Sequence, residues 1–361
     1  MTLGNRERFS RVPSEKEWVQ LYQLANKQSL TSFLIEGVNK VKNANVNLSL
    51  KRGLVLEWIG VGLQTEARNK LQNQRAAELC DLFKKGGFKN CILKGQGTSL
   101  YYEHSEHRQC GDIDIWVSSV SSFKFLDSKV RDEVLEFARA KGWRIGHIDI
   151  KHSDIEIFED VPVEVHFQPS WMYCPSTNKR LMRFFAEEAE KQFGNYDKRV
   201  GFTHTTIDFD LVYSMVHIYR HIFSEGIGLR QLVDYYYILR SVKSDELRVK
   251  SFETLRLLRM EKFVAGVMWI LKECFGMQDE YLLCPVNERH GKFLLSEIMT
   301  AGNFGQYDER TVRVDRNKKF ERGFAQLGRN LRFVTYYPSE VLWSPFWKLW
   351  HWCWRKRKGY L

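Results

Sequence analysis

Five short runs of alternating apolar residues constrain the fold of this chain more than any other feature. Apolar side chains, many of them β-branched, recur there at every second position, which is the period of a half-buried strand. The runs occupy residues 91–93, 113–117, 148–150, 155–157 and 163–167. On both sides of this stretch the apolar spacing changes to that of helices. We therefore expect an α+β fold, with a small mixed β-sheet flanked by N-terminal and C-terminal helical segments.

Helix signals bracket the predicted sheet. Ser14 and Glu17 have the spacing of a capping box, and a long helical pattern over residues 48–82 stops at Gly86-Gly87. Further helices are predicted at residues 98–104, 123–140, 178–192, 207–224, 228–242 and 246–276. The patterns divide the chain into an N-terminal helical segment at 1–85, an α/β core at 86–175, a C-terminal helical domain at 176–300 and a basic, aromatic-rich tail at 301–361.

The composition excludes several classes of protein. With 361 residues, 43% of them hydrophobic, the chain has enough apolar material for a sizeable core. Its seven cysteines are scattered and never form a C-x-x-C pair, so the sequence suggests neither a disulfide framework nor a cysteine zinc site. The sequence shows no signal peptide and no membrane-spanning run. We expect a cytoplasmic protein, or one bound peripherally at the inner face of the membrane.

The positive charge is concentrated near the C-terminal end. The net charge is +11, and residues 301–361 contribute +8 of it through 13 Lys and Arg against five Asp and Glu. A protein that follows the phosphates of a long nucleic acid carries positive charge over its whole body. The distribution therefore argues against long nucleic acid as a partner.

Acidic residues lie on two of the predicted strands. Side chains alternate across a strand, so Asp112 and Asp114 share one face and the isoleucines beside them take the other. Glu164 lies on the polar face of a later strand. If the two strands are neighbours, three carboxylates converge, and they repel one another unless a cation lies between them. Such a set can hold two Mg²⁺ ions, or Mn²⁺ in their place, against a triphosphate.

A glycine-containing turn follows the first predicted strand, in the order Lys94, Gly95, Gln96, Gly97, Thr98. Glycines let backbone N–H groups approach phosphate oxygens, and a helix after the turn adds the positive end of its dipole. Lys94 and Arg108 carry permanent charges near this turn, so both are candidate phosphate ligands. A plain surface position for Arg108 is an equal alternative.

Each of these features also has a purely structural explanation. A lone D-x-D is common on a solvated strand face, glycines mostly make turns, and His166 alone indicates a hydrogen-bonded core histidine. His217 and His221 lie one helical turn apart without a third ligand at a diagnostic spacing. Packing or hydrogen bonding is their favoured role, and a substrate pocket is the second. Another polar group is interpreted as sheet-edge residues rather than a metal site: His147, Asp149 and His152.

Five segments of the chain, taken in order, match a known pattern. They are Leu93-Lys94-Gly95, Arg108, Gly111-Asp112-Ile113-Asp114-Ile115-Trp116-Val117, Val163-Glu164-Val165-His166-Phe167, and the group His217, His221, Gly226-Ile227-Gly228, Arg230 and Asp234. Over about residues 75–245, this set resembles the bacterial uncharacterised nucleotidyltransferase family of the DNA polymerase β-like superfamily. One departure is that Gly95 is followed by Gln96 where the superfamily usually has Gly-Gly or Gly-Ser; Gly97-Thr98 is the nearest approximation.

The resemblance implies an enzyme. It would be a Mg²⁺-dependent nucleotidyltransferase that moves a nucleoside monophosphate from an NTP such as ATP to an unknown acceptor hydroxyl and releases pyrophosphate. Asp112, Asp114 and Glu164 would bind metal and carry the catalysis. The nucleotide would be bound by Lys94, Gly95, Gly97, Thr98 and Arg108. Two alternatives are a catalytically silent nucleotide-binding or scaffold protein and a membrane-peripheral accessory protein of surface-polysaccharide assembly.

The tail carries its own pattern. Trp343, Trp347, Trp350 and Trp354 are spaced to form one stripe of a helix, and a basic cluster at 355–358 follows them. The favoured interpretation is that the stripe docks on the protein's own core. The alternative is an anchor for anionic lipid, or a platform for a phosphate-bearing acceptor. Pro345 is expected to interrupt the helix and to leave Trp343 outside it.

Overall fold

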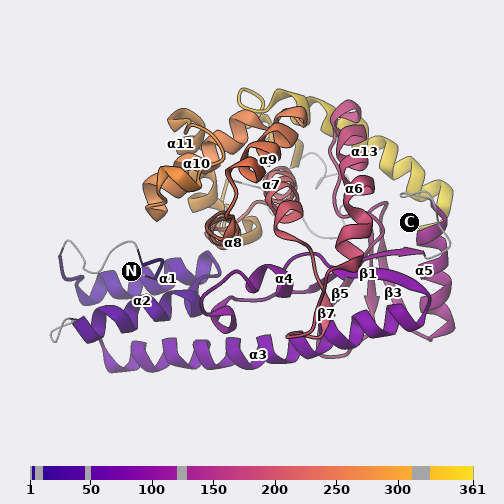
Figure 1. Ribbon diagram of the computed structural model, residues 1–361. Helices are drawn as coiled ribbons and strands as arrows, with labels where there is room; N and C mark the ends of the chain where they lie inside the picture. The colour runs from indigo at the N-terminus through magenta and orange to yellow at the C-terminus, as the bar shows by residue number, and fades with distance from the viewer. Residues whose placement is uncertain (1, 5–10, 45–49, 120–127, 311–325, 361) are drawn as a thin grey trace.

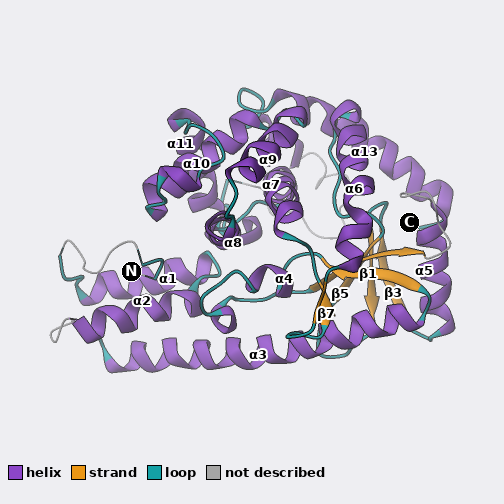
Figure 2. Ribbon diagram, viewed as in Figure 1, coloured by secondary structure: helices purple, strands orange, loops and turns teal. Residues whose placement is uncertain are grey.

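A computed structural model of the chain describes residues 2–4, 11–44, 50–119, 128–310 and 326–360. A five-stranded sheet is flanked by helices, and helical segments precede and follow it along the chain (Figure 2). The predicted α+β class is confirmed.

Three helices build the N-terminal part: α1 (Glu15–Lys27), α2 (Thr31–Ala44) and α3 (Arg52–Lys85). Ser14 and Glu17 form the predicted capping box at the start of α1, and Gly86 caps the end of α3. Trp18 of α1 and Trp58 of α3 are fully buried in a small core of their own. The length of α3 carries it from this core along the molecule to the sheet, so one helix supports both parts (Figure 1).

The five strands are β1 (Phe88–Ile92), β2 (Ile113–Ser119), β3 (Arg144–Ile148), β4 (His152–Glu156) and β5 (Val163–His166). Each of the five predicted runs overlaps one of them. Their order in the sheet is β1-β2-β5-β4-β3, and only β2 and β5 pair in parallel. The register places Asp114 opposite Glu164. The two acidic strands are therefore neighbours, as the convergence of three carboxylates requires.

The two faces of the sheet pack against different helices. Ile113, Ile115 and Val117 belong to the core shared with α3 and α5 (Ser128–Ala140). Trp116 belongs to the larger core on the other face, where it contacts Phe185 of α6 (Pro175–Gly194) and Phe209 of α7 (Ile207–Ser224). Asp114 shares that second face, which explains how a carboxylate becomes 2% exposed between sheet and helices.

The C-terminal helices include α8 (Leu229–Ser241), α9 (Asp245–Leu257), α10 (Glu261–Phe275), α11 (Glu288–Ala301) and α13 (Pro338–Lys358). The single helix predicted over 246–276 is wrong, because the chain turns at Arg259, whose φ of +60° ends α9. The helix predicted at 98–104 is also wrong: α4 (Gln96–Ser99) is one turn long. Of the helix predicted at 123–140, residues 123–127 lie outside the described residues.

Within the described part of the chain, no helix combines the length and the apolar character needed to cross a membrane.

Candidate active site

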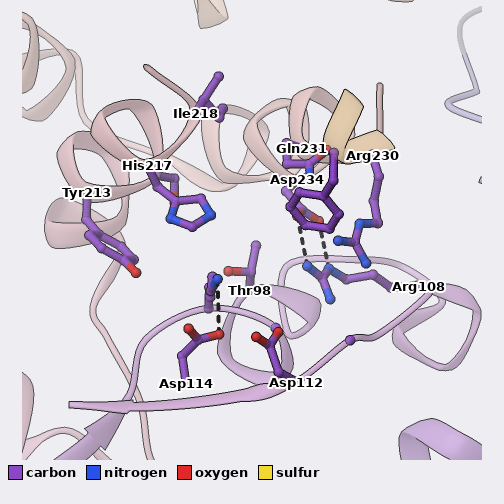
Figure 3. A pocket seen from close by; sticks show the side chains of 15 residues that line it. Thr98, Arg108, Asp112, Asp114, Tyr213, His217, Ile218, Arg230, Gln231 and Asp234 are labelled. Atoms are coloured by element: carbon purple, nitrogen blue, oxygen red, sulfur yellow. Dashed lines mark hydrogen bonds and ion pairs between the residues drawn. The ribbon is translucent and has the colours of Figure 1, made fainter. Parts of the chain in front are cut away.

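Three carboxylates meet where β2 and β5 run side by side. Asp112 directly precedes β2, Asp114 lies within it, and Glu164 lies opposite Asp114 on β5. One oxygen from each of the three lies within 4.8 Å of the others. Figure 3 shows Asp112 and Asp114 pointing from the strand into a pocket, with side chains from α7 and α8 above them.

The donor set fits Mg²⁺ or Mn²⁺. All three ligands are carboxylates, and hard divalent cations prefer oxygen donors. The charge of Asp114, followed by burial, raises the pKa of Asp112 to about 6, which shows how strongly two such groups repel each other here. A divalent cation between the carboxylates would remove this repulsion.

Lys94 provides part of the compensation within the protein itself. It lies two residues after the end of β1, and its Nζ lies 3.2 Å from Oδ2 of Asp114. Burial opposes the charge of this ammonium, but the three neighbouring carboxylates outweigh burial and raise the pKa of Lys94 above its usual value. The sequence predicted Lys94 as a phosphate ligand, and the structure adds an acidic partner that the sequence did not predict.

Two histidines form a second layer beside the acids. The Nε2 of His166 lies 2.8 Å from Asp114 and 3.3 Å from Glu164, so His166 is buried and hydrogen-bonded as expected. His152 lies on β4, and its Nε2 is 3.8 Å from Glu164. Because β4 is an inner strand of the sheet, the predicted edge position of His152 is wrong. His147 does lie on the edge strand β3. The alternation of residues along β4 and β5 was the available signal for this histidine pair.

The predicted phosphate turn forms one wall of the pocket. Gly95 has a φ of +60°, a conformation that strongly favours glycine, and both Gly95 and Thr98 line the pocket. The helix that follows, α4, has only four residues, so the helix dipole expected from the sequence contributes little here.

The residues that depart from the superfamily pattern point away from the pocket. The side chain of Gln96 is 1% exposed and donates to Gln72 of α3 at 2.6 Å. Gly97 faces His204, whose side chain would come within 3.3 Å of an added Cβ. Gln96 therefore anchors the turn to α3. Although Gln96 stands where the superfamily usually has glycine or serine, it does not enter the pocket, and Gly95 and Thr98 line this side of it.

Arg108 forms the opposite wall. It is 5% exposed, and its Nε and one terminal nitrogen donate to both oxygens of Asp234 at 2.7 and 2.9 Å. Tyr102 also donates to Asp234, at 2.5 Å. The surface alternative for Arg108 is wrong: Asp234 fixes its guanidinium at the pocket (Figure 3).

Arg230 adds a second cation beside Arg108. One terminal nitrogen donates to the backbone oxygen of Gln109 at 2.6 Å, whereas its buried Nε has no hydrogen-bond partner among the described residues. Burial, together with the charge of Arg108, lowers the pKa of Arg230. Unlike Arg108, Arg230 forms no ion pair with a carboxylate of the described residues, so this wall favours an anionic ligand.

The roof of the pocket comes from α7. Tyr213 and His217 line it, and burial lowers the pKa of His217 well below its usual value, so His217 is neutral at pH 7. Its ring centroid also lies 4.3 Å from that of His221. His217 thus combines the packing role that the sequence favoured with a position in the pocket.

A comparison with known protein families finds one match. The family model described as uncharacterised nucleotidyltransferase matches residues 14–276, from α1 to the end of α10, and includes every residue of the pocket except Phe304. The match is longer at both ends than the stretch of about 75–245 that carried the resemblance. No curated protein and no solved structure matches the chain.

Proposed function

Because this chain belongs to the uncharacterised nucleotidyltransferase family, we propose that it is a Mg²⁺-dependent enzyme that transfers a nucleoside monophosphate from an NTP to an acceptor hydroxyl. One observation carries the proposal: the pocket has an acidic wall and a basic wall. Asp112 and Asp114 line the first, with Glu164 grouped beside them, and Arg108 and Arg230 line the second. A metal-bound triphosphate carries both kinds of charge that these walls would bind.

Asp112 and Asp114 would each bind both metal ions, and Glu164 would bind the ion nearest the acceptor. When bound, these ions lower the pKa of the attacking hydroxyl and neutralise charge on the triphosphate. The acceptor hydroxyl releases its proton to solvent and its oxygen forms a bond to the α-phosphorus, while the bond from that phosphorus to the oxygen that bridges to the β-phosphorus breaks. Pyrophosphate leaves with the electron pair.

The basic wall would orient the outer phosphates. Arg108 is held by Asp234 and keeps its fork-shaped guanidinium in one orientation, which suits phosphate oxygens. Arg230 would then gain the anionic partner that it lacks. We propose that Lys94 exchanges part of its contact with Asp114 for a phosphate oxygen when metal binds, because the metal then takes over the compensation of the acids.

Nucleotide binding and pyrophosphate release test this proposal separately. We expect an α,β-methylene NTP analogue to bind only with Mg²⁺ or Mn²⁺, as measured by calorimetry, and a panel of NTPs and acceptors to yield pyrophosphate. Asp114→Asn should abolish both the metal-dependent binding and the turnover. Asp154→Asn is the matched control. Asp154 lies on β4, opposite Glu164 of β5, but does not belong to the group of three carboxylates.

Metal-independent binding, or full turnover by Asp114→Asn, would contradict the proposed site. Metal-dependent binding without pyrophosphate release from any NTP in the panel would favour the catalytically silent alternative.

A further inference from the structure

Helix α13 leaves most of its apolar side chains in solvent and turns several polar ones toward the protein, unlike a normal surface helix. The face that packs on the protein carries Val341, Trp347 and Trp354 together with polar and charged side chains: Glu340, Ser344, Lys348, His351 and Arg355. The face toward solvent is apolar from Leu342 to Cys353. A surface helix of a soluble domain usually has the opposite arrangement.

Specific contacts fix the docked face. Glu340 is 1% exposed and accepts hydrogen bonds from the backbone N–H groups of Tyr173 and Cys174 at 2.8 and 3.2 Å. Trp347 stacks on Trp171 with ring centroids 5.3 Å apart. The orientation of α13 about its axis is therefore determined by buried partners.

The predicted tryptophan stripe lies on the boundary between the two faces. Trp347 and Trp354 are half-buried against the protein, where Arg131 lies over the ring of Trp354 at 4.9 Å. Trp343 and Trp350 point outward. The stripe thus combines docking with exposure, and the expectation that Pro345 interrupts the helix is wrong, because α13 continues through it.

The solvent face of α13, which we call the apolar face, is large and rich in tryptophan. Its bulky side chains are 44–67% exposed: Leu342, Trp343, Phe346, Leu349, Trp350 and Trp352. Contiguous exposed apolar surface of this kind marks an interaction site on a soluble protein. Basic residues follow it in the last turn, where Lys356, Arg357 and Lys358 are all exposed.

We propose that the apolar face of α13 binds the surface of a membrane that contains anionic lipid. Tryptophan and leucine side chains at the level of the headgroups, followed by a basic cluster, are the features of a helix that lies in the membrane interface. The charges favour lipid over a second copy of this chain, because the sole acid of α13, Glu340, is buried and offers nothing to pair with the cations. The proposal is independent of the proposed reaction, since the pocket contains no residue of α13.

Vesicle flotation with the full chain tests the proposal. We expect binding to vesicles of phosphatidylcholine mixed with phosphatidylglycerol, and on the order of 100-fold weaker binding to phosphatidylcholine alone or at high salt. Phe346→Ser and Leu349→Ser should each weaken binding by about 10-fold without lowering the melting temperature. Lys356→Glu combined with Arg357→Glu should remove the preference for anionic vesicles.

Leu63→Ser is the matched control, because Leu63 of α3 is 59% exposed and Leu349 is 63% exposed. Failure of the unmodified chain to float, equal binding to both kinds of vesicle, or equal effects of Leu63→Ser and Leu349→Ser would overturn the proposal. A stable dimer in solution that Phe346→Ser dissociates, with no vesicle binding, would also overturn it and would identify the apolar face as a contact between copies.

Discussion

The pocket and helix α13 depart from the usual distribution of side chains in opposite directions. The pocket buries Asp114 and Arg108 and partly buries Lys94 and Arg230, whereas α13 places aromatic side chains in solvent. Buried charges need partners, and exposed apolar surface favours removal from water. Each region is thus incomplete in the protein alone, and the kind of group that each one lacks indicates the ligand that it would bind.

Among the variants of the two regions, we expect the largest effect from a change at Glu164, beside the pocket. Glu164→Gln should reduce turnover by about 10³-fold, because this residue would hold the ion that activates the acceptor. Nucleotide affinity should fall much less, since Asp112 and Asp114 remain to hold the other ion. Single-turnover rates and analogue binding measured on the same preparation separate the two effects, and an equal loss of both would contradict this division of roles.

The basic wall of the pocket is a structural element as well as a candidate ligand site. Asp234→Asn removes the charge that compensates buried Arg108, so we expect a loss of about 3 kcal/mol in the free energy of unfolding. Replacing both partners, as Arg108→Met with Asp234→Leu, should recover much of that loss. Urea denaturation of the unmodified chain, Asp234→Asn and the double variant measures these changes, and a double variant as unstable as Asp234→Asn would argue against the ion pair as the cause.

The two faces of α13 should differ in how much they contribute to the stability of the protein. Glu340→Ala leaves two buried backbone N–H groups without their acceptor and removes the carboxylate that lies 3.5 Å from the guanidinium of Arg220. We expect a loss of about 2–3 kcal/mol in stability, against less than about 0.5 kcal/mol for Leu349→Ser on the apolar face. Thermal unfolding of both variants measures the two stability losses. Equal losses would mean that the apolar face is also packed against the protein.

The sequence predicted local features well and long-range partners poorly. Strand alternation identified all five strands of the main sheet but not the short strands β6 (Tyr196–Asp197) and β7 (Phe202–Thr203). The D-x-D spacing with Glu164 identified the three carboxylates, because strand alternation and this spacing both follow from period-two geometry. The bond of Arg108 to Asp234 joins residues 126 positions apart, and no local pattern encodes it. The spacing of the tryptophans in α13 predicted their stripe, but which of them face inward depends on Trp171 and Arg131, which lie far away in the sequence.

The smallest effect that we expect is a difference between Asp112 and Asp114 in how their ionisation changes the stability of the protein. Asp114 has Lys94 and His166 as partners; these outweigh its burial and lower its pKa, whereas the charge of Asp114 and burial raise the pKa of Asp112 from 3.8 to about 6. A raised carboxyl pKa costs stability as pH rises from about 4 to 6, because the unfolded chain ionises first. A lowered pKa adds stability above about pH 4, and this contribution disappears as pH falls.

Without metal, Asp112→Asn should therefore raise the free energy of unfolding at pH 7 by about 1–2 kcal/mol, and Asp114→Asn should lower it by a similar amount. The difference for Asp112→Asn should shrink toward zero near pH 4, where the unfolded carboxyl begins to protonate. The difference for Asp114→Asn should persist at pH 4 and disappear only as pH falls further, through the lowered pKa of Asp114. Urea denaturation at pH 4, 5.5 and 7 in the presence of a chelator measures both signs. Stabilisation by both substitutions at pH 7 would mean that the repulsion between the acids outweighs the pairing of Asp114 with Lys94 and His166, and the acidic wall would then depend entirely on its metal for compensation.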